Sequence, residues 1–154
     1  MRLLKLLYIA DREALREIGR TISGDNHAAL KKGPILSEFY DIIKGETVLS
    51  SHFAKCFSSA GYQLILKKDA GNGHLNRYEI RKLRAISAEY MNVDDEDLSE
   101  ITHAFPEWIK NRPPGDSSRP IPLTDIADAV GKGGSKQGIQ ERAALTHAVN
   151  ELWR

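Results

Sequence analysis

Hydrophobic residues recur at intervals of three and four over the first eighteen residues, and this spacing predicts an amphipathic helix. The stripe consists of Leu3, Leu4, Leu7, Ala10, Ala14 and Ile18. Gly19 follows it and suits the left-handed conformation in which many helices end. Residues 20–26 are rich in turn-forming types, which indicates a loop after the helix.

A short strand and then a second helix are predicted after this loop. Residues 27–31 are short enough for one strand, bounded by Asn26 and Gly33. Pro34 fits the first turn of a following helix, where its missing N–H costs little. That helix is expected to end at Gly45 and to bury one face, which consists of Leu36, Phe39, Tyr40 and Ile43.

The next segment predicts a helix and then a strand. Leu49, Phe53, Cys56 and Phe57 have helical spacing, and Gly61 closes the segment. Residues 62–68 indicate a strand, because a Gly-rich turn follows them. We expect this strand to pair with residues 27–31 in a small sheet that helices cover, since two short strands alone are marginal.

Two further helices carry clear start signals. Asn76 with Glu79 three residues later forms a capping-box pattern, and the inner face is assigned to Ile80, Leu83, Ala85, Ile86 and Tyr90. The four carboxylates of residues 94–97 suit the N-terminus of the next helix, where the helix dipole favours negative charge. Pro106 is expected to interrupt that helix.

The last third of the chain alternates between loops and short helices. Residues 111–121 are rich in Pro, Gly and Ser and predict an exposed loop. A short helix over 122–130, a Gly-rich linker over 131–138 and a final amphipathic helix reaching Trp153 follow. Together these elements predict one domain over 1–154, of the α+β class and mostly α: a compact helical domain with a small two- or three-stranded antiparallel sheet.

Composition narrows the class of protein. The chain has 154 residues, 41% hydrophobic and 28% charged, which is ordinary for a globular domain. Its formal net charge of +1 makes nucleic acid an unlikely partner. The apolar runs are too short to span a membrane, and the first residues lack a signal-peptide pattern, so we expect a cytoplasmic protein.

Chemistry-bearing residues are few and dispersed. The five histidines and the single cysteine show no metal-ligand spacing, so neither a metal nor another cofactor is expected. His52 and Cys56 lie four residues apart, which favours a small buried cysteine beside a surface histidine over a nucleophile pair. For His103 we favour a half-buried ring with local hydrogen bonds over a binding contact.

Charged residues close to the first helix suggest a structural network. Asp11, Arg12, Arg20 and Asp25 are expected to form ion pairs that fix the helix–loop–strand geometry. The functional alternative is that Arg12 or Arg20 reaches a partner.

Two segments resemble a known family. The first runs KLLYIADRE, GRTISGD and KKGPILSEFYDIIKG between residues 5 and 45, and the second is LSEITHAFPEW over residues 98–108. Both resemble the SocA-like antitoxin or Panacea domain, which is related to phage-associated GepA proteins. The motif positions that we interpret as structural are Tyr8, Asp11, Arg12, Gly19, Gly33, Pro34 and Tyr40.

The resemblance implies an antitoxin: a protein-binding module that neutralises a cognate protein toxin, encoded next door, by direct contact. Some members of the family are linked to protease-mediated disposal of the toxin, so a protease-adaptor role is a second implication. No catalytic residue is required. Two alternatives stay open, namely an enzyme that uses Asp11, Arg12 and His103, and a nucleic-acid-binding regulator that uses the same region.

The sequence does not place the partner surface, but it suggests candidates. We favour the loop over 20–26 and the exposed sides of the two strands, since edge strands offer unpaired backbone. The loop over 112–120 is a second candidate, and the Gly-rich linker allows the last helix to dock on a neighbouring chain in a homodimer. Trp153 is favoured as a core residue over an interface anchor, as is Trp108. The partner-binding candidates are Arg20, Asp25, Lys31, Lys32, His103 and Trp108.

Overall fold

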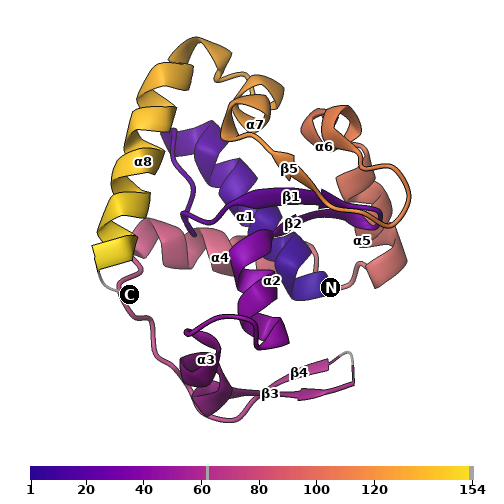
Figure 1. The fold of residues 1–154 in the computed structure, drawn as a ribbon, viewed down its shortest axis with the longest axis vertical. Helices are drawn as coiled ribbons and strands as arrows, with labels where there is room; N and C mark the ends of the chain where they lie inside the picture. The colour runs from indigo at the N-terminus through magenta and orange to yellow at the C-terminus, as the bar shows by residue number, and fades with distance from the viewer. Residues whose placement is uncertain (62, 153–154) are drawn as a thin grey trace.

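A computed structural model describes residues 1–61 and 63–152 of the chain. Within these residues it contains eight α-helices and two small antiparallel sheets (Figure 1). The predicted α+β, mostly helical class is therefore confirmed. No helix in these two ranges is both long and apolar enough to cross a bilayer.

The elements follow one another with short connections. The helices are α1 (Arg2–Ile18), α2 (Ser37–Lys44), α3 (Ser50–Cys56), α4 (Arg77–Glu89), α5 (Asp95–His103), α6 (Pro106–Asn111), α7 (Leu123–Ala129) and α8 (Lys136–Leu152). The strands are β1 (His27–Leu30), β2 (Gly33–Leu36), β3 (Phe57–Ala60), β4 (Gln63–Leu66) and β5 (Arg119–Ile121).

The first sheet has β1 in the middle, with β2 on one side and β5 on the other. His27 is opposite Leu36 on β2 and Ile121 on β5. The prediction that Pro34 begins a helix is wrong, because Pro34 lies within β2 and α2 starts only at Ser37. Since β2 is an edge strand, its proline removes no hydrogen bond that a further strand would need.

The second sheet is a separate hairpin of β3 and β4, at one end of the molecule beside α3 (Figure 1). The predicted pairing of residues 62–68 with residues 27–31 is wrong, since β4 pairs with β3. Phe57 belongs to β3 and not to the helix predicted from its spacing. Gly61, with φ of 60°, makes a tight connection that favours pairing between neighbours in sequence.

Helix α1 is the central element, and it lies behind the first sheet in Figure 1. It packs against β2, α4 and α5. One cluster on α1 joins Tyr8 and Leu15 to Trp108, Ile126 and Ile139. Another joins Ile9 and Ala10 to Ile86 of α4 and Leu98 of α5. Leu4, Ala10 and Ala14 of the predicted stripe are buried, but Leu3 and Ile18 are exposed. Most contacts between α1 and the rest of the domain come from Tyr8, Ile9 and Leu15, which the predicted stripe did not contain.

The start signals of α4 and α5 are confirmed. The Asn76 side chain accepts from the backbone N–H groups of Tyr78 and Glu79, and Glu79 completes the capping box. Asp94 caps α5 in the same way. Ala85, predicted on the inner face of α4, is exposed. The helical period places it one turn beyond Arg81 on the solvent side, while Leu83 and Ile86 pack inward.

The predicted interruption at Pro106 is confirmed, because α5 ends at His103 and a new helix, α6, begins at Pro106, where a proline is tolerated in the first turn. The last third departs from the predicted pattern in two places. A short strand, β5, lies at the end of the segment predicted as loop. The Gly-rich segment forms a 3-10 turn over Gly133–Ser135, and α8 begins directly after it. Trp153 lies outside the described residues.

Candidate partner-binding surface

The loop over residues 20–26 is held from below by Asp11. This carboxylate is 1% exposed. Its Oδ1 accepts from the backbone N–H groups of Ile22 at 2.8 Å and Ser23 at 2.9 Å, and its Oδ2 accepts from the Ser23 hydroxyl. The ring Nε2 of His27 lies 3.3 Å from the same oxygen. Asp11 thus fixes the shape of the loop from within α1.

The far end of the loop is held by Asp25. Its two carboxylate oxygens accept from the backbone N–H groups of Glu38 and Phe39, each at 2.9 Å, so Asp25 caps the start of α2. Burial raises the pKa of Asp25, and the two N–H donors oppose that rise. The Asn26 carbonyl accepts a hydrogen bond from the Ser37 N–H at 2.9 Å. The loop is consequently a fixed feature of the surface.

The predicted ion-pair network among Asp11, Arg12, Arg20 and Asp25 is wrong. Arg12 donates to Glu107 of α6 at 2.7 Å, and Arg20 pairs with Glu79 of α4 at 2.8 Å. Side chains of neighbouring helical residues point about 100° apart, so those of Asp11 and Arg12 contact different elements. Each charged group therefore ties the α1 region to a separate part of the domain.

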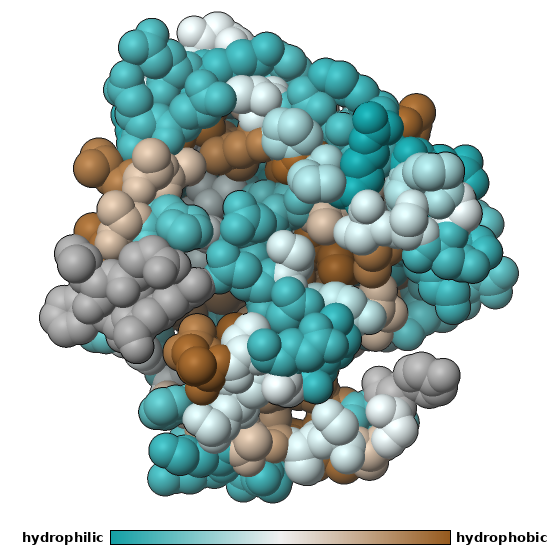
Figure 2. All heavy atoms as spheres, viewed as in Figure 1, coloured by the Kyte–Doolittle hydropathy of each residue, from teal (hydrophilic) through white to brown (hydrophobic). Residues whose placement is uncertain are grey.

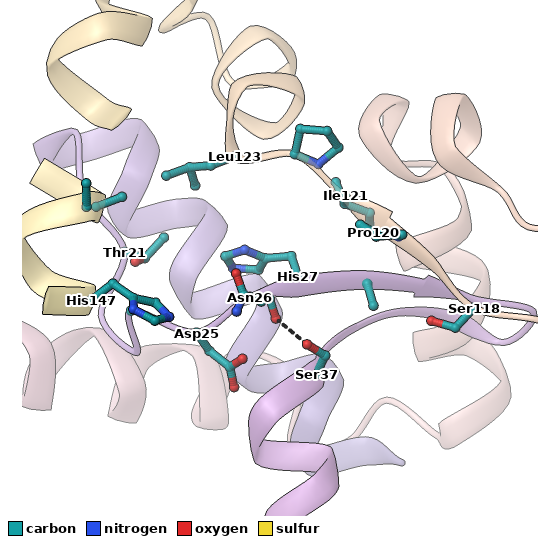
Figure 3. Close-up of a pocket in the computed structure, with 15 residues that line it drawn as sticks. Thr21, Asp25, Asn26, His27, Ser37, Ser118, Pro120, Ile121, Leu123 and His147 are labelled. Atoms are coloured by element: carbon teal, nitrogen blue, oxygen red, sulfur yellow. Dashed lines mark hydrogen bonds between the residues drawn. The ribbon is translucent and has the colours of Figure 1, made fainter. Parts of the chain in front are cut away.

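Two hollows lie on either side of this loop, with volumes of about 640 and 550 Å³. Both are bordered by Gly24, Asp25 and His147 of α8. Figure 3 shows the first hollow, where Thr21 and Asn26 of the loop and Pro120 of β5 surround the opening. Figure 2 shows apolar residues in the recesses of this face, among hydrophilic surroundings.

The lining of the second hollow is more apolar in character. It includes Leu7 and Ile22 near the loop, Phe39 and Ile42 of α2, and Leu83 of α4. Side chains of this kind suit the apolar anchors that a protein partner inserts at an interface. The part played by His147 was missed in the sequence analysis, because nothing in the pattern of α8 indicates which helical face meets the loop.

A buried polar cluster joins α1 to α6. Glu107 is 1% exposed, and its Oε1 accepts from the Tyr8 hydroxyl at 3.1 Å as well as from Arg12. Burial, and then the Glu107 carboxylate, raises the pKa of Tyr8 well above its usual value. The Arg12 guanidinium also lies 4.3 Å from the centre of the Phe105 ring. Sequence analysis did not identify Glu107, the common partner of these side chains.

Lys5 is a second buried polar residue of α1, and it joins α1 to the β1–β2 turn and to α5. Its ammonium group donates to the Lys32 carbonyl and to Thr102 Oγ1, the latter at 3.3 Å. Burial lowers the pKa of Lys5 to about 8. Gly33 has φ of 114°, and a Cβ there would lie 2.4 Å from the Lys5 nitrogen. The turn therefore requires glycine for both its conformation and its space.

The remaining motif residues also have identifiable contacts. Gly19 ends α1 in the left-handed conformation and donates its N–H to the Leu15 carbonyl at 3.0 Å. Tyr40 packs against the cluster of Leu4 and Ile35, and the Lys44 ammonium lies 4.6 Å from its ring centre. These contacts describe a framework around α1.

The partner-binding candidates fall into two groups. Trp108 is 3% exposed, donates from its indole N–H to the Leu30 carbonyl at 3.0 Å and stacks on His103, with 4.1 Å between ring centres. Burial lowers the pKa of His103 first, and the nearby positive charge of Lys5 lowers it further. These two rings support the hairpin from inside. Arg20, Lys31 and Lys32 are exposed, and Asp25 lines both hollows.

The enzyme and nucleic-acid alternatives both use Asp11, Arg12 and His103, but these side chains contact different parts of the domain. Asp11 accepts hydrogen bonds from the loop, Arg12 pairs with Glu107, and His103 stacks on Trp108. Only Asp11 of these three lines either of the two large hollows. Lys31 pairs with Asp116 at 2.9 Å, and it lies beside the first sheet while Lys67 and Lys68 follow the second. The two lysine pairs therefore belong to different sheets.

The comparison with known families now assigns the class. Residues 3–109 match the model of the family "Antitoxin SocA-like, Panacea domain", and this range covers more than half of the chain. The protein therefore belongs to the SocA-like antitoxin family. No curated protein and no solved structure matches the chain.

The matched range includes only part of the candidate surface. It contains α1, the loop, the β1–β2 hairpin and the helices from α2 to most of α6, but neither β5 nor α8. The framework built by Lys5, Asp11 and Glu107 thus lies within the family domain. The β5 and α8 walls of the two hollows come from outside the matched range.

Proposed function

We propose that this chain is a cytoplasmic antitoxin that neutralises a cognate protein toxin, encoded by a neighbouring gene, through direct binding. Membership of the SocA-like antitoxin family is the observation that carries this proposal. The framework residues all make internal contacts, which is the arrangement expected of a scaffold that presents a surface and performs no chemistry of its own.

The toxin is proposed to contact the loop over residues 20–26 and the two hollows beside it. Asp11 and Asp25 hold this loop at both ends, so little conformational freedom is lost when a partner binds. Apolar side chains line much of the second hollow together with the polar Ser23 and Asp25 of the loop, and the exposed Asn26 borders the first hollow. This combination of an apolar centre and a polar rim is typical of protein–protein interfaces.

Two mechanisms follow from binding at this surface. In the first, the chain covers the active surface of the toxin and blocks it by occlusion. In the second, the complex is delivered to a protease, which degrades the toxin. The two mechanisms differ in one observable, because occlusion leaves the toxin level unchanged while delivery lowers it.

The experiment is co-expression with the product of the neighbouring gene. We expect the chain to restore growth when that product is toxic, and a tagged chain to capture it in a pull-down. The toxin level in the same cells separates occlusion from proteolysis, and the molecular mass of the purified complex reports whether the antitoxin is a homodimer. If growth is not restored and no complex forms, the proposal is wrong.

A matched pair of variants locates the surface. Replacing Ser118 and Ala144 with glutamate should weaken capture, because both are exposed and line the first hollow. Replacing Ser59 and Ala60 of β3 with glutamate is the control, since these are the same residue types, exposed and away from the loop. Equal capture by both variants would place the interface elsewhere.

A further inference from the structure

Helix α4 presents an unusual outward face. Five exposed residues follow one another at alternating spacings of four and three along this helix and the turn after it: Arg77, Arg81, Arg84, Ala88 and Met91. This is the spacing with which a helix turns a single stripe toward a partner helix. The opposite face is buried, because Leu83, Ile86 and Tyr90 pack against α1 and α5.

The side chains of the three arginines make no hydrogen bond or ion pair with the side chains that the structure describes, those of residues 1–61 and 63–149. The carboxylates near them are engaged elsewhere: Glu79 with Arg20, and Glu17 with Tyr78 and Lys82. Like charges at three- and four-residue spacing on a helix destabilise it. Arg77, Arg81 and Arg84 therefore form a row that works against the helix that carries it, and an anionic partner would remove that repulsion.

The row is short and ends on apolar surface. From Arg77 to Arg84 it extends about 10 Å along the axis, given 1.5 Å per residue. Beyond it lie the small Ala88 and then Met91, whose side chain is 69% exposed. Methionine adapts its shape to apolar partners, and arginine binds carboxylates through two parallel hydrogen bonds. The stripe thus offers positive charge at one end and an adaptable apolar contact at the other.

We propose that this stripe docks an acidic helix on the surface of the cognate toxin, with carboxylates on Arg77, Arg81 and Arg84 and an apolar residue on Met91. The inference rests on the proposed antitoxin function and extends its footprint. Leu83 borders the second hollow and Glu79 pairs with Arg20 on the inward side of α4, whereas the stripe faces outward. The stripe is therefore proposed as a separate contact with the same partner.

A helical protein partner fits this stripe better than nucleic acid does. A row of three arginines neutralises about three phosphates, which supplies only a small part of the affinity of typical nucleic-acid-binding proteins. The neighbouring cations Arg16, Arg20 and Lys82 are paired with Glu13, Glu79 and Glu17, so they do not extend the row. The apolar end at Ala88 and Met91 also has no counterpart on a phosphate backbone.

The test compares two charge-reversal variants of the full chain, R77E/R81E/R84E and K55E/K68E/K132E. None of these six residues has an ion pair with the side chains that the structure describes, those of residues 1–61 and 63–149, and the three control lysines lie away from the loop and the hollows. We expect the α4 variant to bind the toxic neighbour at least about tenfold more weakly and the control to stay within about twofold. Thermal unfolding of both variants verifies that they are folded.

A third variant, R77K/R81K/R84K, keeps the charge but loses the two-pronged hydrogen bonds, and we expect it to bind at an intermediate level. Equal affinity of the wild type and the α4 variant would overturn this inference and leave the antitoxin function intact. Failure of the wild-type chain to bind the toxin would overturn both. A shift of RNA or DNA that the α4 variant loses, with toxin binding unchanged, would assign the row to nucleic acid and overturn the inference.

Discussion

The two sheets of this protein are alike in strand length but differ in how they are held. The β2–β1–β5 sheet is supported by side chains from distant elements: Lys5 donates to the carbonyl in its β1–β2 turn, Asp11 accepts from the loop that leads into β1, and the Trp108 indole donates to Leu30. The β3–β4 hairpin has no such support among the described residues. Its Ile65 and Leu66 are 47% and 57% exposed.

This difference shows what fixes a small sheet in a small domain. Short strands alone contribute little stability, so neighbours must supply it. In the first sheet α1 provides these neighbours, and buried hydrogen bonds define one geometry. In the second sheet the contacts are mainly those between β3 and β4 and those with α3. We therefore expect the domain to respond strongly to changes at the first sheet and weakly at the second.

The largest effect is expected from Gly33→Ala. The substitution would place a Cβ 2.4 Å from the Lys5 nitrogen and 2.7 Å from Thr102 Oγ1, at a φ of 114°. Backbone strain and overpacking together should lower the free energy of unfolding by about 4 kcal/mol. Chemical denaturation measures this loss.

Gly61→Ala is the matched control in the second hairpin. Its φ is 60°, but nothing lies within 4 Å of the added Cβ. Only the left-handed conformation is then penalised, and the expected loss is about 1 kcal/mol. Equal losses for the two variants would contradict the contrast between the sheets.

The second effect concerns pH and Lys5. Its pKa is lowered by burial to about 8 from 10.5, so between these values the folded chain has lost a proton that the unfolded chain still binds. The free energy of unfolding should therefore rise with pH across this window, by about 3 kcal/mol in total. Below pH 8 both states are protonated and the contribution of Lys5 is constant.

Lys5→Met is the comparison for this measurement. Other groups, such as Tyr8, titrate in both proteins and cancel in the difference. The gap between the unfolding free energies of wild type and variant should change in the wild type's favour from pH 8 to 10.5. A constant gap across this range would show that the Lys5 ammonium keeps its ordinary pKa in the folded protein.

The features that the sequence could predict are those that depend on residues close together in the chain. Local signals predicted α1 and its end at Gly19, the capping box of Asn76 and Glu79, and the acidic start of α5, because each depends on residues within a few positions. The family resemblance arose from residues 5–45 and 98–108 and is confirmed.

Features that depend on distant contacts were not predicted. The strand β2 was mistaken for a helix start, because Pro34 is compatible with both and only pairing with β1 decides between them. Glu107 is a common surface residue type, and its burial follows from Tyr8 and Arg12 nearly a hundred positions earlier. The hollows beside the loop require α8, whose position no local pattern specifies.

The third effect is expected from Asp11→Asn. The variant keeps the shape of the side chain but loses the negative charge that accepts from Ile22, Ser23 and His27. Hydrogen bonds to a buried charged group are worth more than neutral ones, so the unfolding free energy should fall by about 2 kcal/mol. Asp69→Asn is the control, because Asp69 accepts only from the Gly71 N–H in an exposed turn. That variant should change stability by less than about 0.5 kcal/mol.

The smallest effect is expected at the second hairpin, from the double variant I65S/L66S. About half of each side chain is already exposed, so the double replacement removes only part of their buried apolar surface, and the unfolding free energy should fall by only about 1.5 kcal/mol. Hydrogen exchange sharpens the comparison, because the amides of β3 and β4 should exchange through local opening while those of β1 exchange only on global unfolding. A loss of several kcal/mol in I65S/L66S, or slow exchange in both sheets, would show that the hairpin is integrated into the core. If stability is retained but capture of the toxin is lost, Ile65 and Leu66 are exposed because a partner covers them.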